Sequence, residues 1–260
     1  MRVLLERNDV DPNIADEDGR TPLSRAAESG HEGIVRVLLE RNDVDPDVTD
    51  EDGRTPLSRA AESGHEGILR VLLERNDVNP NTTDQDDRTP LSLAAENRHE
   101  GILRMLLERS DVDPDLADRF SQTPLSWAVT SEDEEVVRML LERSDADPDL
   151  ADKFGKTPLA RAAEYGNVGI LRILLERNDV DPDLADRFGQ TPLTRAVSCG
   201  HEEVVRMLLE RNDVNPNTVD EDGRTPLSLA VGNEEIMRIP LERIDANLNT
   251  SDHDSQTAAL

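Results

Sequence analysis

Apolar and polar positions follow one another along this chain in a pattern that returns at a fixed spacing. One copy opens with Thr55-Pro56-Leu57-Ser58-Arg59-Ala60-Ala61, and its Thr-Pro-Leu start recurs, always 34 residues apart, at Thr21, Thr55, Thr89, Thr123, Thr157, Thr191 and Thr225. A fixed period in this range is typical of a solenoid, in which one supersecondary unit is stacked many times. The pattern predicts a single all-α array of stacked helix-turn-helix units.

Each copy contains the signals for a turn and two short helices. Residues 50–54 form a turn in which Gly53 can take a positive φ, Thr55 is an N-cap, and Pro56 is the first helical residue. Apolar residues at helical spacing then predict a short first helix, and a second such run over 66–73 predicts a second helix. The link 76–81, with β-turn residues and a proline, leads to the next copy. Neither helix can bury its apolar face alone, so stacking must make the core.

The 34-residue period also predicts where each copy begins and ends. Met1 is in register with Val35, so the chain begins inside a second helix. Pro240 stands where the previous copy has a leucine, and a proline inside a helix predicts distortion after about residue 230. We expect one array with a partial repeat at 1–15, seven repeats at 16–49, 50–83, 84–117, 118–151, 152–185, 186–219 and 220–251, and a stub at 252–260.

These motifs resemble those of a known family. The Thr-Pro-Leu-Ser-x-Ala frame is similar to the Thr-Pro-Leu-His-x-Ala signature of ankyrin repeats, as are the Asp-x-x-Gly turn, the Gly-His helix junction and the Leu-Leu-Glu of the second helix. Two departures are that serine, alanine or threonine replaces the signature histidine, and that the period is 34 rather than 33. The resemblance implies short hairpin loops between repeats and recognition of a protein along the hairpins and first helices.

Composition and charge narrow the classes of partner. The chain holds 57 acidic and 29 basic residues, a formal net charge of −28, which disfavours nucleic acid and anionic membranes. The single cysteine excludes an internal disulfide and fits a reducing compartment. The sequence shows neither a signal peptide nor a membrane-spanning run. We therefore expect a cytoplasmic or nuclear protein, and a monomer.

Residues that recur in every repeat are explained by folding, so their recurrence is not evidence for catalysis or metal binding. The aspartates at Asp50 and its equivalents are interpreted as turn residues that accept backbone hydrogen bonds. The histidines at His31, His65, His99 and His201 share one repeat position and lie too far apart to share a metal. No phosphate-binding glycine loop or nucleophile elbow is present. We expect no catalytic residues, no metal and no cofactor.

Positions that differ between repeats point to repeats 4–6. Every aromatic residue of the chain lies there, and the turns that carry net negative charge in repeats 1–3 become neutral or slightly positive. Exposed aromatics beside arginine and lysine are typical of binding hot spots. The alternative is that phenylalanine only packs against the next turn and was copied by duplication. The candidate partner-binding residues are Arg119, Phe120, Gln122, Trp127, Lys153, Phe154, Lys156, Tyr165, Arg187, Phe188 and Gln190.

Three hypotheses for the function follow. The first is a non-catalytic module that binds a protein partner along the concave surface, with its main contact in repeats 4–6. The second rests on the Asn-Asp-Val-Asp-Pro link, which resembles that of ankyrin arrays in filamentous fungi. There such arrays are often the recognition end of larger nucleotide-binding (NACHT-type) receptors. The third is a structural spacer without a specific ligand, with which the near-identity of repeats 1 and 2 is compatible.

Overall fold

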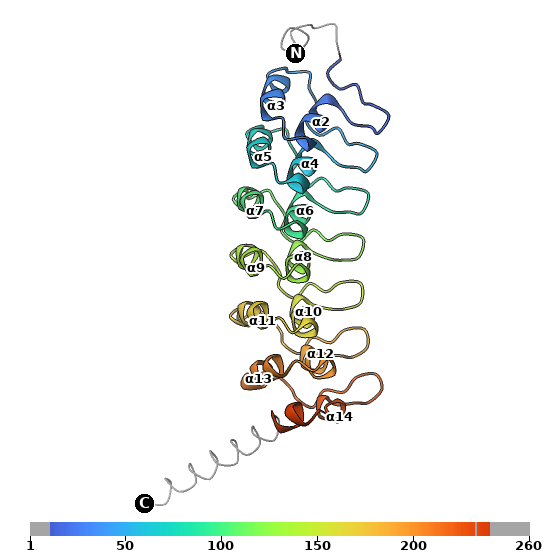
Figure 1. Ribbon diagram of the computed structural model, residues 1–260, viewed down its shortest axis with the longest axis vertical. Coiled ribbons are helices and arrows are strands. Elements are labelled where there is room, and N and C mark those ends of the chain that lie inside the picture. Colours follow the sequence, from blue (N-terminus) through green and yellow to red (C-terminus); the bar gives the residue numbers. More distant parts are fainter. Residues whose placement is uncertain (1–10, 232, 240–260) are drawn as a thin grey trace, which may run out of the picture. The chain divides into compact units, whose positions relative to one another are not determined.

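The computed structural model describes residues 11–231 and 233–239, which form helix pairs joined by turns and contain no strand. The chain divides into two compact parts at residues 147 and 148, and each is described by itself. In the N-terminal part the first helices are α2 (Pro22–Glu28), α4 (Pro56–Ser63), α6 (Pro90–Glu96) and α8 (Pro124–Thr130). The second helices are α3 (Glu32–Leu39), α5 (Glu66–Leu73), α7 (Glu100–Leu107) and α9 (Glu134–Leu141). Each kind of helix forms its own row (Figure 1).

The C-terminal part repeats the arrangement. Its first helices are α10 (Pro158–Tyr165), α12 (Pro192–Cys199) and α14 (Pro226–Leu229), and its second helices are α11 (Val168–Leu175) and α13 (Glu202–Glu210). Residues 234–239 are also helical. The distortion expected at Pro240 lies outside the described residues, although α14 is already shorter than every other first helix. No helix in the described ranges has the length and apolar content needed to cross a bilayer.

The first helices begin where the sequence predicts, for the predicted reason. Thr55 is in the extended region, and its side-chain oxygen accepts the backbone N–H of Ser58 at 3.2 Å. Pro56 follows as the first helical residue. The Ser58 hydroxyl, in place of the signature histidine, lies 3.1 Å from the Thr55 hydroxyl and is fully buried. The serine therefore completes the cap inside the core.

Small residues allow the two helices to share one core. Ala60, Ala61, Leu57, Leu69 and Leu72 have no exposed surface. First helices contact the first helices of neighbouring repeats within each part, and second helices do the same. The core is therefore continuous along each part, as stacking of incomplete units requires.

Neighbouring repeats are also joined at the helix junction by histidine. The ring Nε2 of His65 bonds the Glu28 carbonyl oxygen at 3.0 Å, and His99 bonds that of Glu62 at 3.0 Å. The ring covers the glycine that ends the previous first helix: a Cβ on Gly64 would lie 2.8 Å from the His99 ring. Gly64 also has a φ of +78°. Repeat 4 has Asp133 at the position of this histidine. There the position of the glycine, in repeat 3, is occupied by Arg98.

The pairing of glycine with histidine predicts a compensated double substitution. Gly64→Arg alone should lower the free energy of unfolding by about 2 kcal/mol, from left-handed backbone strain and overlap with the His99 ring. Adding His99→Asp copies the Arg98–Asp133 arrangement and should restore at least half of the loss. Urea denaturation followed by circular dichroism measures both, with His99→Asp alone as the control. A double variant less stable than Gly64→Arg would contradict this account of the junction.

Candidate functional site

An aspartate at the start of each hairpin turn organises the surface on which the candidate residues lie. Oδ1 of Asp50 accepts the backbone N–H groups of Asp52 and Arg54, each at 3.0 Å. Its Oδ2 accepts the guanidinium of Arg59 at 2.6 Å, and Asp50 is only 6% exposed. This confirms the interpretation of the recurring aspartates as turn residues. The arginine partner, nine residues along, was missed, although Arg25, Arg59, Arg161 and Arg195 share one repeat position.

The side chain that each hairpin turn exposes at its tip depends on the third residue of the turn. In repeat 2 that residue is Asp52, whose carboxylate bonds Arg59 at 2.6 Å. The Arg59 hydrogen bond is the main reason why the pKa of Asp52 lies below its usual range. In repeats 5 and 6 the same position holds Phe154 and Phe188, which are 48% and 53% exposed. Arg161 and Arg195 then bind the turn aspartates, and Arg195 also lies 3.6 Å from Glu164.

The hairpin turns of repeats 5, 6 and 7 are joined through their backbones. The N–H of Arg187 donates to the Phe154 carbonyl oxygen, and that of Glu221 to the Phe188 carbonyl oxygen, each at 3.0 Å. The rings of Phe154 and Phe188 are therefore carried on bonded, neighbouring turns. The Lys153 ammonium lies 5.0 Å from the centre of the Phe154 ring, within cation–π range. We call Lys153, Phe154, Arg187 and Phe188 the aromatic tip surface.

The remaining candidates of the C-terminal part have other surroundings. Tyr165, at the end of α10, is 43% exposed. Lys156 forms an ion pair with Glu164 at 2.7 Å that repeats the Arg54–Glu62 pair, so it is explained by the fold. Gln190 is half-buried, and its backbone N–H donates to Asp186 at 3.0 Å.

In the N-terminal part the candidates are more enclosed. Phe120, Gln122 and Trp127 are half-buried. The exposed Arg119 pairs with Asp86 at 2.7 Å, and its guanidinium lies 4.8 Å from the centre of the Phe120 ring. The indole N–H of Trp127 donates to Asp118 Oδ2 at 3.2 Å. Trp127 therefore fills the place that Arg59 has in repeat 2.

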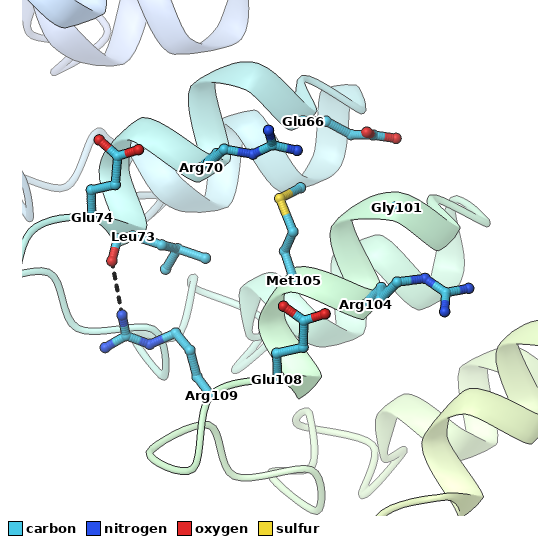
Figure 2. Close-up of a pocket in the computed structure, with 9 residues that line it drawn as sticks. All are labelled: Glu66, Arg70, Leu73, Glu74, Gly101, Arg104, Met105, Glu108 and Arg109. Atoms are coloured by element: carbon cyan, nitrogen blue, oxygen red, sulfur yellow. Dashed lines mark hydrogen bonds between the residues drawn. The ribbon is translucent and has the colours of Figure 1, made fainter.

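A hollow apart from these residues lies between α5 and α7. It is an open groove of about 780 Å³ lined by Glu66, Arg70, Leu73, Glu74, Gly101, Arg104, Met105, Glu108 and Arg109. Figure 2 shows Met105 pointing between the two helices, and the Arg109 guanidinium donating to the Leu73 carbonyl oxygen at 2.9 Å. The lining is the Glu–Arg–Leu–Glu pattern that α5 and α7 share, so the groove follows from the fold.

Nothing within residues 11–231 and 233–239 gathers three or more side chains able to hold a metal. The histidines lie in separate junctions, as the sequence predicts. Cys199 is exposed as a residue, and partial removal of its thiol from water is the main reason why its pKa is raised. A raised thiol pKa opposes the nucleophilic thiolate form.

Stacked helix pairs with bonded hairpin turns define the ankyrin class of repeat protein. The family model for ankyrin repeats, in three copies, matches residues 1–84, 76–152, 144–220 and 179–252, so the chain belongs to this family. Ankyrin repeat domains generally mediate protein–protein interaction and are typically non-catalytic. No curated protein matches the chain.

A solved structure supports the same assignment. The crystal structure of the ankyrin repeat domain of Bcl-3, described as a unique member of the IkappaB protein family, is similar with a TM-score of 0.78. The two sequences are 28% identical, and the match covers 86% of this chain and 99% of that domain.

The position of Trp127 predicts an asymmetry between two substitutions. Trp127→Phe should lower the free energy of unfolding by about 1–3 kcal/mol, because the buried Asp118 oxygen loses its donor. Trp127→Arg restores the donor found in repeats 1, 2, 5 and 6 and should cost less. Urea denaturation followed by circular dichroism compares the two, since both lack the tryptophan fluorophore. Equal losses would show that the indole contributes through its ring area and not through its N–H.

Proposed function

We propose that this chain is a non-catalytic module that binds a protein partner, with the main contact in repeats 4–6. The aromatic tip surface carries the proposal. An exposed aromatic side chain on a rigid turn provides contact area without a large loss of conformational freedom on binding. Phe154 and Phe188 do not pack away against the neighbouring turns, since about half of each residue is exposed. This observation favours recognition over the duplication hypothesis.

Charge on the hairpin turns indicates the chemistry of the partner segment. The Arg187 guanidinium is exposed and makes no ion pair among the described residues, and Lys153 stands at the equivalent position of the preceding turn. Turns of repeats 1 and 2 carry exposed Glu17, Asp18, Glu51 and Asp52 instead. A partner segment with apolar side chains and acidic residues complements the aromatic tip surface. The acidic turns elsewhere would repel it and so limit where it binds.

Phe120, Arg119, Gln122 and Trp127 belong to the same proposal as secondary contacts in repeat 4. Each is half-buried or ion-paired, so we expect their truncation to affect binding less than truncation of Phe154 or Phe188. The absence of nucleic-acid and membrane partners, the monomeric state and an intracellular location are also part of this proposal. They rest on the acidic net charge and the single cysteine.

The first test is a loss of binding in the Phe120→Ala, Phe154→Ala, Phe188→Ala triple variant. The partner is first identified by placing a photo-crosslinking amino acid at position 154 or 188 of the full chain, with position 14 as the control. Ile14 is 62% exposed but lies far from these turns in the sequence. Calorimetry with the partner should then show an affinity at least about thirtyfold lower in the triple variant, which corresponds to one hot-spot residue.

Two controls make the outcome decisive. Ile14→Ala removes exposed apolar surface in the N-terminal part and should leave the affinity unchanged. Thermal unfolding of the triple variant should show a modest loss from the half-buried Phe120, while substitutions at the exposed Phe154 and Phe188 change stability little. A folded triple variant with unchanged affinity would remove the proposed contact. Arg187→Glu should in addition slow association at low salt, and a faster rate would show that the partner segment is basic.

A further inference from the structure

The links between repeats contain a side-chain position at which asparagine and aspartate make different contacts. At this position Asn13 and Asn81 each join two repeats with both ends of the amide. Oδ1 of Asn81 accepts the N–H of Asp113 at 3.0 Å, and its Nδ2 donates to the Asp111 carbonyl oxygen at 2.6 Å. Asn13 makes the same pair with the N–H of Asp45, at 2.9 Å, and the Asp43 carbonyl oxygen, at 2.8 Å.

Asp47 holds the same place in repeat 1 but can make only one of the two bonds. Its Oδ2 accepts the N–H of Asn79 at 2.9 Å. Its Oδ1 is buried and has no hydrogen-bond partner. By the register of Asn81, this oxygen stands where an amide N–H₂ would donate to the Asp77 carbonyl oxygen. A carboxylate has no proton to donate, so one buried oxygen stays unsatisfied.

The surroundings of Asp47 are acidic on both sides. Asp45 in its own link and Asp77 in the next link raise its pKa, but the main reason for the raised pKa is burial of the carboxylate. The two basic groups of these links are already engaged: Arg41 pairs with Asp43 at 2.6 Å and Arg75 with Asp77 at 2.5 Å. These pairs hold the pKa values of Asp43 and Asp77 below their usual range. Asp47 therefore takes up a proton before either of them.

We propose that Asp47 is an acid-strengthened link between repeats 1 and 2. On protonation its carboxyl O–H donates to the Asp77 carbonyl oxygen and completes the two-bond contact that Asn81 makes permanently. Asp115 and Asp183 are equivalent positions, where both oxygens share a single N–H donor, from Asp147 and Asn215 respectively. Burial is likewise the main reason for the raised pKa values of Asp115 and Asp183.

The sign of the effect follows from the direction of the shift. A carboxyl whose pKa is higher in the folded chain than in the unfolded chain opposes folding while it is ionised. The penalty is fully present above the folded pKa of Asp47. It is relieved as the pH falls through that value towards the unfolded value of about 3.9. Asp43 and Asp77 act in the opposite direction, because their stabilisation is lost as the pH falls below their unfolded value.

The test compares Asp47→Asn with Asp45→Asn in the full chain. Both remove one negative charge from the same link, and both residues occur naturally in repeat 2, as Asn81 and Asn79. Asp45→Asn keeps the one bond of that side chain, to the N–H of Asp47 at 3.0 Å, because an amide oxygen can accept it equally. At pH 7, Asp47→Asn should have a thermal midpoint about 2–4 °C above that of Asp45→Asn, as expected for one added buried hydrogen bond.

This difference should shrink as the pH is lowered towards about 4, because the original side chain then gains its own donor. The reverse variant, Asn81→Asp, should lose midpoint temperature at pH 7 and recover in acid, with Asn79→Asp as its control. Carboxyl NMR should show Asp47 titrating above an ordinary aspartate. The proposal is overturned if the two variants have equal midpoints at pH 7, if their difference does not change with pH, or if Asp47 titrates at or below the ordinary value.

Discussion

Each repeat from 2 to 7 depends on one buried carboxylate at the start of its hairpin turn. Asp50 fixes the turn through two backbone N–H groups and, through Arg59, ties that turn to the first helix. Burying a charge is costly unless it is paired and hydrogen-bonded, so the second oxygen requires a donor in every repeat. The geometry of the turn and its attachment to the first helix therefore depend on satisfying this group.

The donors differ between repeats, which shows that the requirement is for a donor and not for arginine. Repeat 3 has Leu93 at the arginine position, and there Arg88 binds Asp84 at 3.0 Å while Arg54 of the previous repeat binds it at 3.3 Å. Repeat 4 uses the indole of Trp127, and repeat 7 uses Arg224 at 2.8 Å. A residue that breaks the sequence pattern can therefore still serve the same local need.

The helices, their caps and the turn aspartates were predictable because each depends on residues close together in sequence. Thr55, Pro56 and Gly53 act within a few positions, and the period supplies many copies of the same evidence. Contacts between repeats were not predictable in the same way. The bond from His99 to Glu62 joins residues 37 positions apart, and the need for Gly64 beneath that ring appears only in three dimensions. The exposure of the candidate side chains could not be predicted from the sequence either, because Phe120 and Phe154 share a repeat position but differ in burial.

A residue that differs from the repeat pattern is therefore not evidence of function when a neighbouring residue accounts for the difference. Arg98 donates to the Ser131 carbonyl oxygen, Trp127 donates to Asp118, and Lys156 pairs with Glu164, so each of these departures has a structural explanation. Phe154 and Phe188 differ from these residues because about half of each stays exposed. Replacing a turn aspartate with phenylalanine removes one carboxylate acceptor from the nearby arginine and leaves half of an apolar residue in water. The Lys153 ammonium lies 5.0 Å from the centre of the Phe154 ring, but this contact leaves about half of the residue exposed. The remaining exposure of Phe154 and Phe188 is why the binding proposal rests on these two side chains.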